Sequence, residues 1–404
     1  MSEKATSREE PHEPVALLVV GGGPAALEAA RSYRSHGGTG RVLMLSADRH
    51  APYFRPALTK DHLRGEVTAA ELSLEEDGFY RDQEVELELD CEVVGLDPRE
   101  RVVRTATGRS VPYESCVLAV GSTPLPLPVP GGDHPAVRLL RSRAQGQELR
   151  SAVEDARSVV VVGSGFIGCE AAASLRATGH DVTLVSSEPR PQHARLGPDA
   201  GARLAQWLQE DGVRLRGGVD VRAVEDGRVV HLSDGTAVAA DLVLVAVGVR
   251  PRTKWVEDSG VRCRQGRIVT DSSMATAFPG LYAVGDAALA HNTTAGRRLP
   301  VEHWGEALRM GEVAGAAAAG VAQEWAEVPG FWSEIGGRTL KYKAWGDGYD
   351  TVRFEAHDEC AFTVWYGSNG VLVGVLTHGA DEDDERGGGL VEEHAAFARA
   401  MDRS

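Results

Sequence analysis

The sequence predicts an α/β protein with two Rossmann-like dinucleotide-binding domains, the first interrupted by the second, and a further C-terminal α+β domain. Three observations support this fold class. A chain of 404 residues exceeds what a single hydrophobic core usually supports. A glycine-rich segment that follows an apolar strand occurs twice. Residues 321–404 contain stretches that alternate apolar and polar side chains, which is typical of a small sheet.

The repeated segment reads LLVVGGGPAALEAA at Leu17–Ala30 and VVVVGSGFIGCEAA at Val159–Ala172. In each copy an apolar strand, a glycine turn and a helix precede a second apolar strand, at Arg41–Leu45 and at Asp181–Val185. This order is the opening βαβ unit of a dinucleotide-binding fold. Two copies in the same order therefore predict two such folds.

The glycine positions in each copy have separate physical roles. The first allows the tight turn from strand to helix, and the second lets the backbone approach a pyrophosphate. The third must be small so that the helix can pack on the strand. These positions are Gly21, Gly23 and Ala26 in the first copy and Gly163, Gly165 and Gly168 in the second. The helix N-terminus then offers free N–H groups to the phosphates.

Two further strand-like segments, Cys116–Gly121 and Leu242–Gly248, are expected to close the two nucleotide-binding sheets in parallel fashion. Proline-rich chain follows each of them, at Thr123–Pro130 and Arg250–Arg252, as is typical of a crossing between domains. The first domain is therefore predicted to comprise residues 15–125 and 250–320. The second is predicted to comprise residues 126–249.

The rest of the chain predicts one more strand, a helix and a separate domain. Thr270–Ala287 ends in an apolar strand that runs into Gly285 and Asp286, and Glu302–Ala319 has a helical pattern. Residues 321–404 are expected to form the α+β domain, with an acidic loop at 381–388 and a terminal helix near Leu390–Met401. Residues 1–14 are interpreted as a disordered leader without the apolar core of a signal peptide. No apolar run approaches the roughly 18 residues that span a bilayer, so we expect a cytoplasmic protein.

Charge and cysteine content argue against several classes of function. The net charge of −16 disfavours nucleic acid or an anionic membrane as the main partner. Residues 321–404 hold 7 Lys or Arg and 16 Asp or Glu, a net of −9. This imbalance indicates either an acidic face or a solvated surface with a disordered run at Asp381–Glu385. The five cysteines show no CxxC or CxxxxC spacing, so neither a local redox dithiol nor a metal site is expected.

Together these motifs resemble the FAD-dependent pyridine-nucleotide oxidoreductases, within them the branch of ferredoxin reductases and apoptosis-inducing factors, over roughly residues 15–346. The resemblance implies FAD as cofactor and NAD(P)H as co-substrate. Pro52–Lys60 (PYFRPALTK) is similar to a family motif that places Arg55 and Pro56 beside the isoalloxazine ring and Lys60 near its N5. In the family this lysine pairs with the glutamate of the second glycine motif, here Glu170.

Other FAD positions follow from the same resemblance. Asp48 is either the acid that binds the adenosine ribose or a solvated turn residue. Asp286 matches the aspartate that binds the ribityl chain. The segment Val301–Trp304 begins a helix directed at the flavin pyrimidine, in which His303 either titrates near the flavin or is structural. The implied FAD-binding residues are Gly21, Gly23, Pro24, Ala25, Ala26, Asp48, Arg55, Pro56, Lys60, Val94, Gly121, Arg141, Gly285, Asp286, Glu302, His303 and Trp304.

The second repeat would bind NAD(P)H, with Phe166 and Ile167 facing the cleft where nicotinamide meets flavin. Ser186 stands where the family usually has the glutamate that selects NAD. Either Arg190, His193 or Arg195 binds a 2′-phosphate or Glu188 turns back to the ribose, so the coenzyme preference stays open with a slight lean to NADPH. The implied NAD(P)H-binding residues are Gly163, Gly165, Phe166, Ile167, Gly168, Glu170, Ser186, Arg190 and Gly248. The implied catalytic residues are Lys60, Glu170 and Trp304.

Cysteine-dependent relatives carry their cysteines in the region that here is His50–Thr59, which contains none. Electrons are therefore expected to leave the flavin directly, for an iron–sulfur protein such as a ferredoxin. The alternatives are an NAD(P)H oxidase, a quinone or small-acceptor reductase, and a redox-regulated flavoprotein of the apoptosis-inducing-factor type. An acidic ferredoxin requires a basic patch, for which Arg250–Lys254 and Arg297–Arg298 are candidates. The oligomeric state is expected to be monomer or homodimer.

Overall fold

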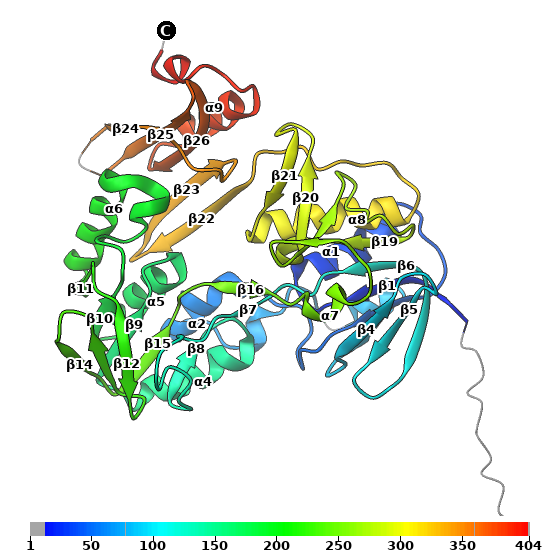
Figure 1. Cartoon of the computed structure of the whole chain (residues 1–404), viewed down its shortest axis with the longest axis horizontal. Coiled ribbons are helices and arrows are strands. Elements are labelled where there is room, and N and C mark those ends of the chain that lie inside the picture. Colours follow the sequence, from blue (N-terminus) through cyan, green and yellow to red (C-terminus); the bar gives the residue numbers. More distant parts are fainter. Residues whose placement is uncertain (1–12, 77, 359, 403–404) are drawn as a thin grey trace, which may run out of the picture.

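A computed structural model describes residues 13–76, 78–358 and 360–402. Residues 1–12, most of the predicted leader, lie outside this range. Figure 1 shows two α/β units side by side, joined by two strands near the middle, with the C-terminal sheet above the second unit. Within the described residues, no helix is both long and apolar enough to cross a membrane.

The first unit is built on a sheet with strand order β3-β2-β1-β6-β5-β4. Strand β1 (Val15–Val20) pairs in parallel with β2 (Val42–Leu45) and β6 (Ser110–Leu118). The remaining strands are β3 (Val85–Glu88), β4 (Val93–Asp97), β5 (Val102–Thr105) and β19 (Leu281–Ala283), which pairs with β6. The parallel pairing of β1 and β6 confirms the expected closure at Cys116–Gly121.

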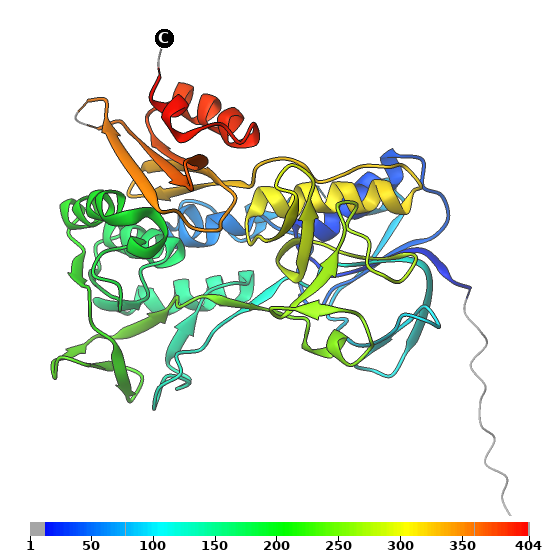
Figure 2. The ribbon, with the colours of Figure 1, turned by 45° about the horizontal axis from the view of Figure 1, so that its top comes forward.

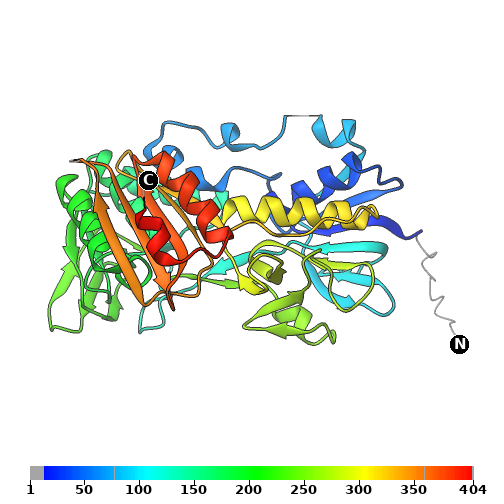
Figure 3. The same ribbon diagram turned by 90° about the horizontal axis from the view of Figure 1, so that it is seen from above.

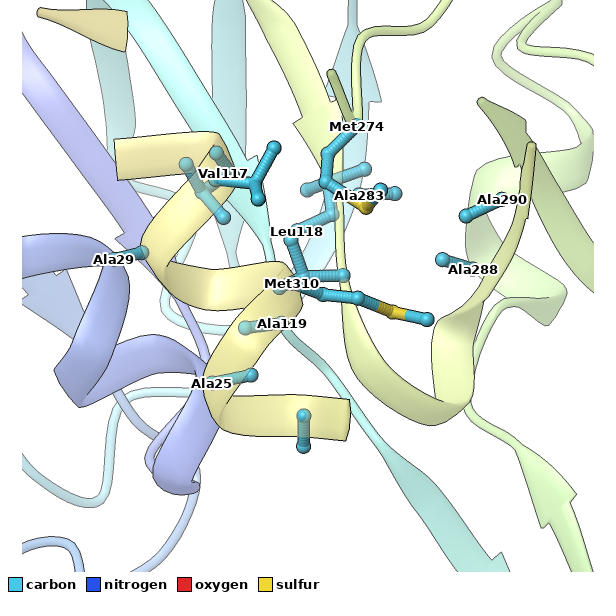
Figure 4. Close-up of a cluster of buried hydrophobic side chains, with 14 of the residues drawn as sticks. Ala25, Ala29, Val117, Leu118, Ala119, Met274, Ala283, Ala288, Ala290 and Met310 are labelled. Carbon is cyan, nitrogen blue, oxygen red and sulfur yellow. The ribbon is translucent and has the colours of Figure 1, made fainter. Parts of the chain in front are cut away.

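Two helices of the first unit, α1 (Pro24–Ser35) and α8 (Trp304–Ala318), lie against each other, as Figure 3 shows from above. They approach closely because α8 has glycines at the contact. A Cβ atom on Gly311 would lie 2.5 Å from the Ala25 carbonyl oxygen, and one on Gly315 would lie 2.3 Å from that of Ala29. Behind the contact, Met310 packs with Leu118 and other buried apolar side chains (Figure 4). This packing fixes the N-terminus of α8 beside the first glycine loop.

The second unit has a fully parallel sheet with strand order β11-β10-β9-β15-β8. Its strands are β8 (Val137–Leu139), β9 (Ser158–Val162), β10 (Asp181–Val185), β11 (Arg214–Arg216) and β15 (Leu242–Val245). The helices are α4 (Arg143–Glu154), α5 (Phe166–Ala177) and α6 (His193–Glu210). A small antiparallel sheet is formed by β12 (Val221–Glu225), β13 (Val229–Leu232) and β14 (Ala237–Ala239).

The two predicted crossings pair with each other. Strand β7 (Ser122–Pro124) leads out of the first unit and runs antiparallel to β16 (Val249–Pro251), which leads back. Beyond β16 a four-stranded sheet is formed by β17 (Cys263–Arg264), β18 (Arg267–Thr270), β20 (Ala288–Asn292) and β21 (Arg297–Pro300). The short helices are η1 (Arg55–Thr59), α2 (Asp61–Arg64), η2 (Ala70–Leu72), α3 (Phe79–Asp82), α7 (Lys254–Glu257) and η3 (Gly285–Ala287).

The C-terminal part contains the expected antiparallel sheet, with strand order β22-β23-β26-β25-β24. Its strands are β22 (Gly330–Ile335), β23 (Arg338–Ala344), β24 (Thr351–Ala356), β25 (Phe362–Ser368) and β26 (Val371–His378). Helix α9 (Asp381–Glu392) covers one face of the sheet in Figure 2, and η4 (Phe397–Met401) follows it. The side chains of the sheet join the apolar clusters of both α/β units.

Two sequence predictions for this part were wrong. An acidic loop was predicted at residues 381–388, with a disordered run at Asp381–Glu385, but these residues form the N-terminal part of α9. The terminal helix was predicted near Leu390–Met401, but it begins nine residues earlier, at Asp381. The cause is electrostatic, since acidic side chains in a first turn interact favourably with the helix dipole. In addition, Asp384 is buried and accepts a 2.8 Å ion pair from Lys343 on β23.

Candidate functional site

The first glycine loop has the geometry of a phosphate-binding turn. Gly21 has φ +139°, and a Cβ atom there would lie 2.2 Å from the Ala119 carbonyl oxygen, so a larger residue does not fit. Gly23 caps α1 and Pro24 occupies its first turn. The Arg55 guanidinium lies 3.6 Å from the position of a Gly23 Cβ atom. A positive side chain therefore stands over the free N–H groups at this helix N-terminus.

Asp48 lies after β2 in a turn that uses both of its carboxylate oxygens. One oxygen accepts hydrogen bonds from the backbone and ring of His50, both at 3.1 Å, and the other accepts one from the Tyr53 hydroxyl at 3.0 Å. These bonds hold Asp48 in the turn after β2, and its role in binding the adenosine ribose stays a prediction. Val94 lies on β4, well outside this turn in sequence, and is 47% exposed.

The predicted contact between Lys60 and Glu170 is present. The Lys60 ammonium lies 2.6 Å from the Glu170 carboxylate, and both side chains are buried. The same carboxylate accepts hydrogen bonds from the hydroxyls of Thr59, at 2.6 Å, and Ser333, at 2.7 Å. A buried charge is tolerable only when it is paired and hydrogen-bonded, and Glu170 meets both conditions. This junction joins the first unit, α5 of the second unit and β22 of the C-terminal sheet.

Asp286 lies in η3, directly after Gly285, and is buried. Its carboxylate accepts a hydrogen bond from Ser122 and an ion pair from Arg141, both at 2.5 Å. Burial lowers the pKa of Arg141, although Asp286 opposes that shift. Ser122 follows Gly121, which has φ +62°. Four of the implied FAD residues therefore gather around the carboxyl ends of β6 and β19, namely Gly121, Arg141, Gly285 and Asp286.

Several ring side chains contact one another at the N-terminus of α8, in the same region. His303 caps the helix and its ring lies 4.6 Å from that of Phe331. Burial and the Arg195 charge lower the pKa of His303 to about 4, so its imidazole is neutral near pH 7. Trp304 makes an edge contact with Phe54 at 5.3 Å, and Phe54 stacks on Trp332 at 6.5 Å. The preceding Glu302 pairs with Arg267.

In the second glycine loop, Gly163 and Gly168 leave no room for a side chain, whereas Gly165 is exposed. A Cβ atom on Gly163 would lie 2.3 Å from the Ala246 carbonyl oxygen, and one on Gly168 would lie 2.0 Å from that of Gly163. Gly165 and Gly248 are exposed, and Ile167 is 46% exposed. The Phe166 ring contacts Phe331 at 4.8 Å, so α5 begins beside the aromatic residues at α8.

Ser186 follows β10, as predicted, but its hydroxyl is not free. It lies 2.6 Å from the Ser164 hydroxyl and accepts a hydrogen bond from the Glu188 backbone at 3.1 Å. Arg190 is exposed and donates to the Pro198 carbonyl oxygen at 3.1 Å. No group of three or more His, Cys, Asp or Glu side chains is placed to hold a metal ion in the described ranges.

Several polar atoms of the site fit bound cofactors. The Nε atoms of Arg55 and Arg141 and Nδ1 of His303 are buried without a hydrogen-bond partner in the part of the chain that the structure describes. Buried polar atoms normally have partners. Together with the side-chain-free loops at Gly21 and Gly163, these atoms fit a phosphate-bearing, hydrogen-bonding ligand such as FAD on the first unit and a nicotinamide coenzyme on the second.

Sequence reasoning missed the residues that β22 contributes. Phe331, Trp332 and Ser333 contact His303, Phe54 and Glu170 respectively. The alternating pattern predicted a sheet here but not which strand reaches the site. The adjacent aromatics in GFWSEI do not distinguish this strand, because β25 of the same sheet also has two, Trp365 and Tyr366.

Comparison with known proteins agrees with this geometry. Residues 15–311 match the family model described as pyridine nucleotide-disulphide oxidoreductase. A ferredoxin–NAD(P)(+) reductase of Sphingomonas is 31% identical over 95% of this chain and 94% of its own length. Human apoptosis-inducing factor 3 is 30% identical over 90% of this chain and 61% of its own length. The covalent complex of putidaredoxin reductase and putidaredoxin superposes with a TM-score of 0.89, at 27% identity, over 96% of this chain and 95% of that one.

Proposed function

Because the chain belongs to the pyridine nucleotide-disulphide oxidoreductase family, we propose that it passes electrons from NAD(P)H through FAD to an iron–sulfur protein such as a ferredoxin. The named ferredoxin reductase covers nearly the whole chain, which supports the same reaction type here. FAD, when bound, accepts two electrons as a hydride and can release them one at a time.

The observation that carries this proposal is the junction of Lys60 and Glu170. It brings the segment implied to lie at the flavin into direct contact with the helix that follows the coenzyme loop, at 2.6 Å. The two predicted nucleotide sites are therefore held in one fixed geometry, with Ser333 of β22 as the third support. Fixed positioning of the two reactants is a large part of the catalysis of such a transfer.

The side chains of this site have separate proposed roles. Lys60 places a positive charge where reduction adds negative charge, and the N-terminus of α8 adds a partial positive charge worth up to about 2 kcal/mol. Arg141 and Asp286 would hold hydroxyl groups of the cofactor, and Arg55 would hold its diphosphate. His303, neutral near pH 7, is suited to donate or accept a hydrogen bond without adding charge.

An exposed tryptophan favours a protein as acceptor over a small molecule. Trp332 is 39% exposed, and Phe54 lies between it and Trp304. Exposed tryptophans are enriched at protein interfaces. The row Trp304, Phe54 and Trp332 would therefore connect the flavin region to a surface on which a partner can dock.

We also propose the domain division 15–125 with 250–320 for FAD, 126–249 for NAD(P)H and 321–404 as the third domain. The mutual pairing of β7 and β16 at the two crossings supports it. We also propose a cytoplasmic location, which agrees with NAD(P)H as the electron source.

Anaerobic stopped-flow spectroscopy tests the function. The FAD-loaded protein is reduced with NADH or NADPH and then mixed with a [2Fe–2S] ferredoxin, a quinone or oxygen. We expect fast flavin reduction, fast reoxidation by ferredoxin and slow reoxidation by oxygen. Rapid turnover with oxygen or quinone and none with ferredoxin would establish an oxidase or small-acceptor reductase instead. Slow turnover with a long-lived flavin–nicotinamide complex would indicate a redox-regulated flavoprotein, and failure to bind FAD would overturn the proposal.

A further inference from the structure

The end of β10 offers no carboxylate to a coenzyme ribose. In dinucleotide-binding folds an acidic residue about 20 residues beyond the glycine loop accepts hydrogen bonds from the 2′-hydroxyl of NAD, and a nearby arginine accommodates the 2′-phosphate of NADP. Here that position holds Ser186, whose buried hydroxyl is already bonded to Ser164 and to the Glu188 backbone. Ser187, the next residue, is exposed.

The nearest acid, Glu188, is directed away from this position. Its carboxylate accepts a hydrogen bond at 3.2 Å from the backbone N–H of Ala194, in the first turn of α6. Moving the carboxylate to a ribose would leave that helix N-terminus without this partner. With Ser186 in place of an acid, no carboxylate at this position repels a 2′-phosphate. The Glu188 carboxylate binds the start of α6 instead.

The residues that lead into α6 lie beside the coenzyme loop. Gln192 is buried, yet it has the left-handed backbone conformation, φ +56° and ψ +21°, which is unfavourable for a side chain of this kind. Its amide nitrogen lies 3.9 Å from the position of a Gly165 Cβ atom. Nδ1 of the neighbouring His193 is buried without a hydrogen-bond partner among the described residues. An unpartnered buried polar atom beside this loop points to a ligand there.

One exposed arginine of this segment is free to serve the ribose end of the coenzyme. Arg190 lies four residues after Ser186 and donates a hydrogen bond to the Pro198 carbonyl oxygen. Arg195, in the first turn of α6, lies instead close enough to His303 for its charge to lower the pKa of that histidine. We propose that this half-site binds the 2′-phosphate of NADPH, with Arg190 as its main cation, and that the protein uses NADPH in preference to NADH. The proposal rests on the coenzyme half of the proposed function and is independent of the electron acceptor.

The binding test uses fragments that need no turnover. Adenosine 2′,5′-bisphosphate and adenosine 5′-monophosphate, which differ by the 2′-phosphate alone, are titrated into the FAD-loaded protein by calorimetry. We expect the bisphosphate to bind at least ten times more tightly, and Arg190→Ala to remove most of that difference. The matched change Arg203→Ala, at an arginine on α6, the helix that follows Arg190, is expected to leave it unchanged. Equal binding of the two fragments would overturn the proposal.

The kinetic test compares flavin reduction by the two coenzymes. We expect the ratio of kcat/KM for NADPH to that for NADH to exceed 10, and Ser186→Glu to lower this ratio by at least ten-fold. A glutamate at a buried position can disturb the fold. The exposed change Ser187→Glu is therefore measured as well, and it should also lower the ratio. Preference for NADH would refute the 2′-phosphate site but leave the proposed function standing. Reduction by neither coenzyme would refute both.

Discussion

At the scale of single residues, Glu306 is the buried carboxyl group whose charge is most costly. It lies in the first turn of α8 and accepts hydrogen bonds from the Trp325 indole at 2.7 Å and the Gly330 backbone at 3.4 Å. Burial raises the pKa of Glu306 to about 7, with Glu327 adding to the rise and Arg309 opposing it. Glu306 thereby ties α8 to the segment that leads into β22, and the link is sensitive to pH.

The expected consequence is a pH-dependent stability. Between the ordinary pKa of 4.5 and about 7, the folded protein keeps a proton that the unfolded chain has released. The free energy of unfolding therefore falls as pH rises through this window, by roughly 3 kcal/mol from this group. Glu306→Gln should abolish that decrease. Urea unfolding of FAD-loaded wild type and variant at pH 5 and pH 8 measures the difference, and identical pH dependence in the two proteins would contradict it.

Residues of the site were predictable where a local motif specifies them. The contact of Lys60 with Glu170 was implied by the resemblance to the family, whose motifs both residues match, and the structure shows it at 2.6 Å. Thr59 and Ser333, which complete the hydrogen bonding of Glu170, were not predictable. A hydroxyl group has no sequence pattern of its own, and Ser333 reaches the site through the tertiary position of β22.

At the scale of elements, α9 shows how packing overrides propensity. Three successive glycines lie inside this helix, although each costs about 1 kcal/mol relative to alanine. A Cβ atom on Gly387 would lie 2.8 Å from Val375, and one on Gly388 would lie 2.9 Å from Lys343, so these two glycines allow α9 to lie flat on the sheet. The sequence predicted a loop here because the run of acidic side chains was interpreted as a solvated, disordered segment.

Gly389 differs from its neighbours because a Cβ atom there would meet nothing within 4 Å, and the position is exposed. Gly389→Ala should therefore raise the free energy of unfolding by about 1 kcal/mol, since alanine loses less backbone entropy in a helix. Gly387→Ala, two residues away, provides the control and should lower it by about 1–3 kcal/mol through overpacking against Val375. Equilibrium denaturation compares the two variants. Equal effects at both positions would show that packing of α9 does not decide them.

The central strands of the two parallel sheets, in contrast, were predictable, whereas the edge strands β3, β8 and β11 were not predicted. An apolar run that ends at a glycine, such as Val159–Val162 before Gly163, indicates by itself where the strand lies and where it ends. The four-stranded sheet β17-β18-β20-β21 lacked such signals, because its strands are short and pair across long intervals of sequence. Non-local pairing of this kind depends on the rest of the fold.

At the scale of the whole molecule, a net charge of −16 has to be reconciled with an acidic protein partner. The structure gathers exposed arginines around one turn. Arg250 and Arg252 flank the end of β16, and Arg262 and Arg264 lie on or beside β17. The hydrogen bond from the Thr253 hydroxyl to the Gly266 carbonyl oxygen joins the two segments. This arginine cluster is a local positive region on an otherwise acidic molecule.

We expect the cluster to accelerate the encounter with an acidic iron–sulfur protein through long-range attraction, which acts on the association rate more than on contacts. Arg252→Glu combined with Arg264→Glu should lower the second-order rate of flavin reoxidation by an acidic ferredoxin about ten-fold at low ionic strength. The deficit should vanish near 0.5 M salt, where screening shortens the range of charge interactions to a few ångströms. Arg222→Glu combined with Arg228→Glu, two exposed changes in the second unit, adds the same negative charge away from the cluster. If this control slows the reaction equally, the rate depends on total charge and the cluster has no steering role. If only the change at Arg252 and Arg264 slows it, the position of the arginines decides the encounter.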